Sequence, residues 1–147
     1  MGNELILVVD DNEAGRYAKC RMLRQADFQV KEAGSGGEAL QIIAAERPDL
    51  VCLDVRLPDI NGFEVCRRIK TDPLLRTMVL QMSASFVGQD DKVRGLEGGA
   101  DGYLVSPVEP EEFLATVRSL LRIQQVETEL LLSARQWRVT FDEYGIR

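Results

Sequence analysis

The stretch LILVVDDNEAG, residues 5–15, runs five apolar residues directly into two adjacent carboxylates, Asp10 and Asp11. A short continuous apolar run is typical of a strand that is buried on both faces, as in a parallel sheet. Two unit charges about 4 Å apart repel by roughly 4 kcal/mol at an effective dielectric near 20. The pair therefore needs a cation beside it, or one carboxyl group must keep its proton.

The same alternation of apolar runs and helical spacing continues along the chain. Strands are expected over residues 5–9, 28–32, 50–53, 78–82 and 102–105. Helices are expected over residues 13–25, from a Ser35 cap to Glu46, over 63–71, in a glycine-interrupted segment within 85–100, and over 111–122. Five strands alternating with five helices predict an α/β fold, a five-stranded parallel sheet with helices on both faces. The first helix is expected to bury Tyr17, Cys20 and Leu23.

Composition excludes several classes of protein. The net charge of −6 and pI near 4.8 argue against direct nucleic-acid binding, which needs a basic face. No apolar run approaches a membrane span and no secretory signal is visible, so a cytoplasmic location without membrane contact is expected. Three cysteines without metal-site spacing indicate core thiols. The absence of histidine excludes Ser–His and Cys–His catalysis and any phosphohistidine role for this chain.

Carboxylates and hydroxyls follow the predicted strands. Asp10 and Asp11 follow the first strand, Asp54 the third, Ser83 the fourth and Ser106 the fifth. Ligands of such sheets bind at the carboxyl ends of the strands. Three carboxylates in one cleft favour a divalent cation with oxygen ligands, Mg²⁺ or Mn²⁺. A carboxylate beside such a metal can attack phosphorus, and Asp54 is the best candidate because the Asp pair is left to hold the metal.

Four motifs, taken together, resemble the receiver domain of two-component response regulators. They are VVDDN (8–12), LDVRLPDINGFE (53–64), MSAS (82–85) and GYLVSPV (102–108), in the family's order over residues 4–122. The resemblance implies the flavodoxin-like doubly wound (βα)5 fold and a receiver domain over residues 1–122. It also implies that Asp54 accepts a phosphoryl group from a histidine kinase or histidine phosphotransfer protein. Such a domain is not a conventional enzyme, although it can hydrolyse its own phosphoaspartate.

The same resemblance assigns the metal ligands. Asp11 and Asp54 would ligate Mg²⁺ directly, the backbone carbonyl of Arg56 would be a third ligand, and Asp10 would hold the metal through water. These roles are carried over from the family's motif.

The switch residues are implied in the same way. Ser83 would turn its hydroxyl toward the phosphoryl group, and rotation of Tyr103 would report phosphorylation. The chain departs from the family at Ser106, where the family has a lysine before the proline. The site therefore lacks a cation from that position, and the Arg56 side chain is one alternative source.

Residues 123–147 form an extension beyond the receiver. Ile123, Val126, Leu130, Ser133 and Trp137 recur at alternating steps of three and four residues, as in a coiled-coil seam. No glycine or proline interrupts residues 118–137, so the fifth helix is expected to continue unbroken. The apolar spacing predicts either that two chains form a homodimer through this helix or that the helix folds back on its own domain. It also resembles a linker toward a PAS-type or sensor-kinase module of a longer protein.

Three other functions compete with a phosphorylated switch. A phosphorylation-independent pseudo-receiver that acts in docking or dimerisation is suggested by Ser106. A flavin carrier is disfavoured because no phosphate-binding loop follows the first strand. A metal-dependent phosphatase is disfavoured because Asn12 occupies the place of the second aspartate that it needs.

Overall fold

The structure is a computed structural model that describes residues 3–84 and 89–143, with side chains described up to residue 84 and over residues 92–135. The strands are β1 (Leu5–Val9), β2 (Gln29–Ala33), β3 (Leu50–Asp54), β4 (Met78–Ala84) and β5 (Gly102–Ser106). The helices are α1 (Glu13–Gln25), α2 (Gly36–Glu46), α3 (Gly62–Lys70), α4 (Gln89–Glu97) and α5 (Pro110–Glu143). The predicted elements are confirmed with small shifts, chiefly in β2, which begins one residue later, and β4, which continues to Ala84.

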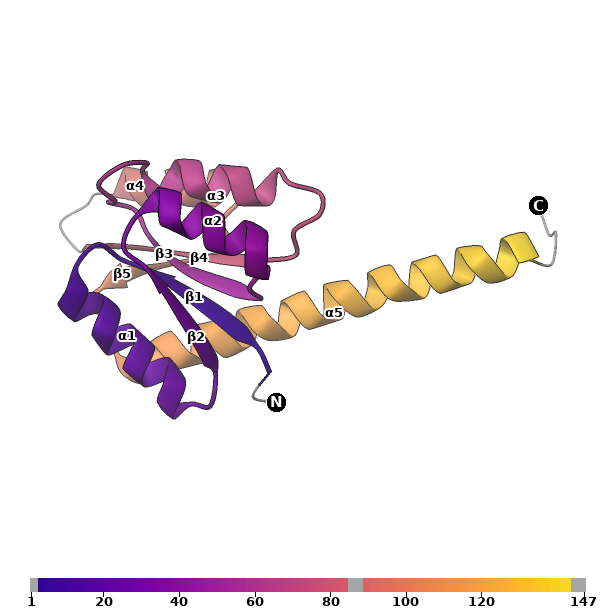
Figure 1. Cartoon of the computed structure of the whole chain (residues 1–147), viewed down its shortest axis with the longest axis horizontal. Coiled ribbons are helices and arrows are strands. Elements are labelled where there is room, and N and C mark those ends of the chain that lie inside the picture. The colour runs from indigo at the N-terminus through magenta and orange to yellow at the C-terminus, as the bar shows by residue number, and fades with distance from the viewer. Residues whose placement is uncertain (1–2, 85–88, 144–147) are drawn as a thin grey trace.

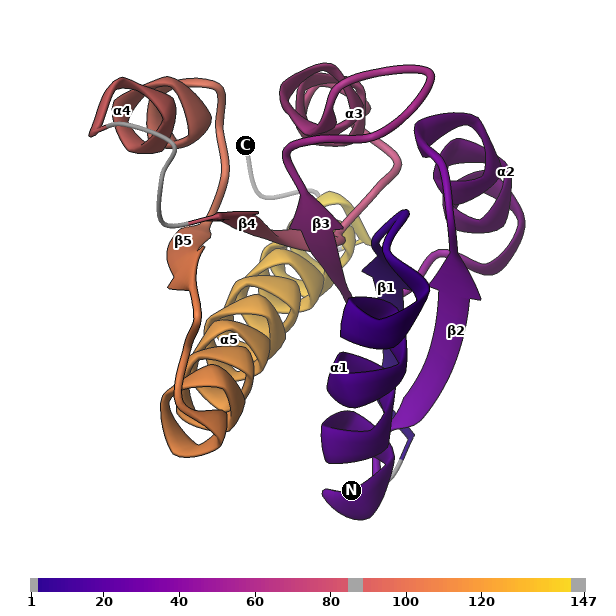
Figure 2. The same ribbon diagram turned by 90° about the vertical axis from the view of Figure 1, so that its left-hand side faces the viewer.

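The five strands form one parallel sheet in the order β2-β1-β3-β4-β5. Helices α1 and α5 cover one face and α2, α3 and α4 the other (Figures 1 and 2). The chain reverses its winding direction between β1 and β3, which makes the carboxyl ends of these strands the switch point where such sheets bind ligands. The flavodoxin-like doubly wound fold expected from the sequence is confirmed.

Two apolar cores fix the helices against the sheet. On one face, Phe113 and Val117 of α5 pack with Cys20 and Leu23 of α1. On the other, α2 and α3 pack on side chains that include Leu53. Cys20, Cys52 and Cys66 are all buried free thiols, as expected of core cysteines. Alternate residues of the central strands β1, β3 and β4 enter the two cores, so these strands are buried on both faces and their ends are held in fixed register.

The expected inner face of α1 is wrong at one position. Tyr17 is 64% exposed, whereas Cys20 and Leu23 are buried. Gly15 and Lys19, one helical turn apart, lie on the partly buried side instead. An apolar stripe therefore describes only part of the surface that α1 turns toward the sheet.

Helix α2 begins at the predicted cap, with a variation. The Glu38 amide donates to Ser35 Oγ at 3.2 Å, as in a capping box. The Glu38 carboxylate accepts from the Gly34 amide at 2.7 Å, one residue before the cap. Asp59 adds two further bonds from the amides of Gly36 and Gly37, and so ties the loop after β3 to α2.

Helix α5 is a single helix of 34 residues that passes under the sheet and continues beyond it (Figure 1). The Gln124 side chain lies 3.4 Å from both Asp49 Oδ1 and the Arg76 carbonyl, near the point where the helix leaves the domain. The expected unbroken helix is confirmed up to Glu143, and this described part of it does not fold back. Over the described residues, no helix combines the length and apolar character that crossing a membrane requires.

Candidate metal and phosphoryl site

Three carboxylates meet at the carboxyl edge of the sheet. Asp10 and Asp11 follow β1, and Asp54 ends the adjacent β3. One oxygen of each lies within 4.8 Å of the other two. Asp10 is 5% exposed, Asp54 is half-buried and Asp11 is exposed. The cluster is open to solvent on the Asp11 side, which would let an ion or a phosphorylated group enter.

The environment of Asp54 opposes its ionisation. Burial, followed by the negative charge of Asp10, raises the pKa of the Asp54 carboxyl to about 6. The positive charge of Lys19 acts in the opposite direction, and Asp11 raises the pKa further. A divalent cation among the three oxygens would lower the pKa of Asp54 again, because it stabilises each carboxylate in its charged form. The acidic oxygens and their mutual repulsion therefore fit Mg²⁺ or Mn²⁺.

Lys19 is a member of the site that sequence reasoning missed. Its Nζ donates to Asp10 Oδ2 at 3.0 Å, and the side chains of this pair are only 13% and 7% exposed. Asp10 Oδ1 accepts from the Asn12 amide at 2.9 Å. Both oxygens of Asp10 are therefore engaged, one of them by a cation. The available signal was weak, since a lysine on an amphipathic helix normally lies in solvent.

Ser83 and Tyr103, the two residues predicted to act as a switch, are in direct contact. Tyr103 on β5 donates its phenol proton to Ser83 Oγ at 2.8 Å. Ser83 is 4% exposed and follows Met82, the residue of β4 paired with Asp54. A Cβ on Gly95 of α4 would lie 2.8 Å from the Tyr103 ring, so the glycine leaves space for that ring. Ser83, one residue past the partner of Asp54, is thus linked through the Tyr103 ring to helix α4.

Ser106 lies farther from the cluster. Ser106 pairs with Ala84 on β4. Its own strand, β5, is separated from β3 by β4. Adjacent strands are separated by about 4.8 Å, so the backbones of β3 and β5 are about 10 Å apart. The peptide bond between Ser106 and Pro107 is cis. Arg56, the other residue considered as a source of charge, lies in the exposed loop after β3.

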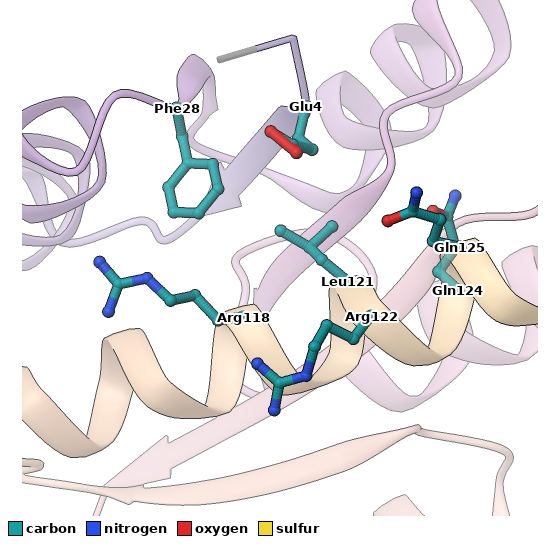
Figure 3. A pocket seen from close by; sticks show the side chains of 7 residues that line it. All are labelled: Glu4, Phe28, Arg118, Leu121, Arg122, Gln124 and Gln125. Carbon is teal, nitrogen blue, oxygen red and sulfur yellow. The ribbon is translucent and has the colours of Figure 1, made fainter. Parts of the chain in front are cut away.

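A separate hollow of about 400 Å³ lies at the opposite edge of the sheet, between α5 and the starts of β1 and β2 (Figure 3). Its lining mixes charged, amide and apolar side chains: Glu4, Phe28, Arg118, Leu121, Arg122, Gln124 and Gln125. None of the residues considered above for metal or phosphoryl chemistry lines it.

Residues 6–118 match the response regulator receiver domain family, so the chain belongs to that family. It is a receiver domain of two-component signalling, in which phosphorylation by a histidine kinase is the general function. The chain is 38% identical over 125 residues to the response regulator PleD of Caulobacter vibrioides, covering 85% of this chain and 28% of that protein. It is 45% identical to the response regulator MprA of Mycolicibacterium vanbaalenii, covering 80% of this chain and 50% of the relative.

Solved structures agree with this assignment. A putative response regulator from Chloroflexus aurantiacus is 36% identical, with a TM-score of 0.78 over 82% of this chain and 98% of that one. The receiver domain of a signal transduction histidine kinase from Syntrophus aciditrophicus is 29% identical, with a TM-score of 0.75 over 81% and 90%. The chain spans between about a quarter and a half of the length of the two curated relatives named above.

Proposed function

We propose that this chain is a phosphorylatable switch in which Asp54 accepts a phosphoryl group from a phosphohistidine of a separate protein. The observation that carries the proposal is the convergence of the Asp10, Asp11 and Asp54 oxygens within 4.8 Å at the end of β3. Asp11 and Asp54, with the backbone carbonyl of Arg56, would hold Mg²⁺ directly, and Asp10 would hold it through water. The bound metal would neutralise the phosphoryl oxygens and align them for in-line attack.

The covalent step uses the Asp54 carboxylate as nucleophile. One of its oxygens attacks the phosphorus of the phosphohistidine, and an O–P bond forms as the P–N bond breaks. The imidazole leaves with the electron pair of that bond, and a proton from solvent keeps it neutral. The product is an acyl phosphate on Asp54. Water attacking the same phosphorus would later return the aspartate.

The phosphoryl group would change the setting of Ser83. An oxygen of the phosphoryl group offers the serine hydroxyl an acceptor, and charge-assisted hydrogen bonds are about twice as strong as neutral ones. The Tyr103 hydroxyl, 2.8 Å from Ser83 Oγ, would respond to that change. Because the Tyr103 ring lies against Gly95, the surface formed by α4 and β5 would differ between the two states.

Metal binding gives a direct test with a defined pH dependence. Because burial raises the pKa of Asp54 to about 6, its ionisation destabilises the metal-free fold. This cost is absent below the unfolded pKa, grows as pH rises, and is complete above the folded value. Millimolar Mg²⁺ should therefore raise the melting temperature by several degrees at about pH 8 and by much less at about pH 5.

Asp11→Asn is the informative variant for this measurement, because it removes one proposed ligand at an exposed position. It should reduce the Mg²⁺ effect at the higher pH. If Mg²⁺ leaves the melting temperature of the native chain unchanged at both pH values, the proposed metal site is contradicted. Adding beryllofluoride, a phosphoryl analogue, should raise stability further only when Mg²⁺ is present. The phosphorylation-independent alternative predicts no response to this analogue.

The boundary after residue 122 separates the proposed receiver from a helical extension, which we propose to be a dimerisation helix and a linker toward a further module. Figure 1 shows that the helix continues beyond the domain, and the apolar side chains exposed on this part of it support the proposal. Ile123, Val126 and Leu130 of the predicted seam are 45%, 55% and 65% exposed. The Trp137 side chain lies outside the described residues. Two such helices side by side would bury these residues in a parallel coiled coil.

A pair of leucine substitutions tests the dimer. Leu130 occupies the seam, whereas Leu132, 56% exposed, lies off it. Leu130→Glu should place like charges in the seam and shift the chain from dimer to monomer in analytical ultracentrifugation, by at least about tenfold in dissociation constant. Leu132→Glu should leave the dimer intact. A native chain that stays monomeric at high concentration, or equal effects of the two substitutions, would contradict this seam.

A further inference from the structure

We infer that Lys19 supplies the positive charge of the phosphoryl pocket, so that the lysine missing at position 106 is replaced by one on a different element, α1. The inference rests on the proposed function of Asp54. It assigns Lys19 as a positioning residue that balances charge around the reacting groups.

Contact and burial are the first argument. Lys19 Nζ lies 3.0 Å from Asp10 Oδ2, and both side chains are largely withdrawn from water. The ion pair of Arg24 and Glu32 at the surface differs, since these side chains are 51% and 41% exposed and 3.5 Å apart. An ammonium group loses several kcal/mol of hydration on burial, and only strong local attraction retains it there. The three carboxylates of the cluster provide that attraction.

Local backbone structure is the second argument. Gly15 lies one turn before Lys19, on the same side of α1. A Cβ at position 15 would lie 2.8 Å from Asp10 Oδ2, the same oxygen that accepts the Lys19 proton. Without that Cβ, the first turn of α1 can approach the carboxylate closely. Gly15 therefore leaves the space in which α1 approaches Asp10, and Lys19 makes the contact with the same carboxylate oxygen.

Charge is the third argument. With all groups ionised, three carboxylates and one ammonium leave two excess negative charges, which one divalent cation balances. The Lys19 charge reaches beyond its direct partner, because an oxygen of Asp54 lies within 4.8 Å of one of Asp10 in the same cluster. The same charge would attract a phosphoryl group on Asp54. Ser106, two strands from β3, has neither the charge nor the length to do so.

The test compares Mg²⁺ and beryllofluoride binding to the native chain and to Lys19→Gln. Removing a positive charge favours a bound cation and disfavours a bound anion. Lys19→Gln should therefore bind Mg²⁺ more tightly and beryllofluoride, at saturating Mg²⁺, more weakly, each on the order of tenfold. A residue that only supports the fold could not shift the two affinities in opposite directions. Lys19→Arg, which keeps the charge, should stay close to the native chain in both.

Relocating the charge provides the matched control. Adding Ser106→Lys to Lys19→Gln returns an ammonium group to the pocket from β5. This double variant should recover most of the lost beryllofluoride affinity, and it remains informative where Lys19→Gln alone lowers the melting temperature. Equal weakening of both ligands, no change in either, or failure of Ser106→Lys to restore binding would overturn the inference. If the native chain binds Mg²⁺ but no beryllofluoride, the proposed function itself fails.

Discussion

Gly62→Ala should destabilise the fold by about 3 kcal/mol or more, because position 62 has no room for a methyl group. Gly62 is buried at the start of α3, and its amide donates to the Val55 carbonyl at 2.8 Å. A Cβ there would overlap the backbone carbonyl of Asp54 and lie 2.8 Å from Gln81 Nε2. The obstacles are strand backbone and a fully buried amide side chain, neither of which can move aside easily.

The same substitution should also disturb the site. Gln81 Nε2 donates to the Leu53 carbonyl at 3.0 Å, directly before Asp54, so a displaced Gln81 releases the end of β3. The melting temperature should fall by roughly 10 °C or more in a thermal unfolding experiment. Gly34→Ala is the control, because among the described residues its Cβ would meet only Arg16 Nη1, at 3.5 Å. Similar melting temperatures for the two variants would show that the end of β3 tolerates displacement.

Most of the fold could be predicted from the order of the apolar segments. The strand Leu50–Asp54 has no charged residue before its final carboxylate. Such a continuous apolar run indicates a strand that is covered on both faces, as in a parallel sheet. The residues at which the helices and strands end were harder to predict. Strand β4 continues through Ser83 to Ala84, because pairing with β5 extends to Ser106, and no local signal in the sequence carries that information.

The candidate site was predictable where it depended on strand ends. Asp10, Asp11 and Asp54 meet because adjacent parallel strands β1 and β3 end at the same edge. Helix α1 could not be read in this way. Its inward-facing side includes a glycine and a lysine, while Tyr17, the expected core residue, is 64% exposed. Lys19 faces inward because Asp10 attracts it, and that contact depends on the packing of α1 against β1.

The complete loss of phosphoryl acceptance in Asp54→Asn is the largest effect expected of any substitution here. An amide is a poor nucleophile toward phosphorus and cannot form an acyl phosphate. Asparagine preserves the shape of the side chain and relieves the repulsion by Asp10 and Asp11, so the variant should be folded and at least as stable as the native chain at neutral pH. The loss would therefore reflect chemistry.

Asp27→Asn is the matched control for this experiment. Asp27 is an exposed aspartate in the turn between α1 and β2, at the opposite edge of the sheet. Its backbone has φ of 70°, in the left-handed region that asparagine also tolerates well. The substitution removes one carboxylate, as Asp54→Asn does, without touching the acidic cluster. Asp27→Asn should accept a phosphoryl group on Asp54 as the native chain does.

The decisive measurement is the intact mass of the native chain, Asp54→Asn and Asp27→Asn after incubation with Mg²⁺ and a small acyl phosphate. The native chain and Asp27→Asn should each gain one phosphoryl group, and Asp54→Asn none. Hydroxylamine should remove the added group, because it cleaves an acyl phosphate and leaves a phosphate ester on a serine or tyrosine intact. A native chain that gains no mass, or an Asp54→Asn variant that still gains a hydroxylamine-sensitive group, would contradict Asp54 as the phosphoacceptor.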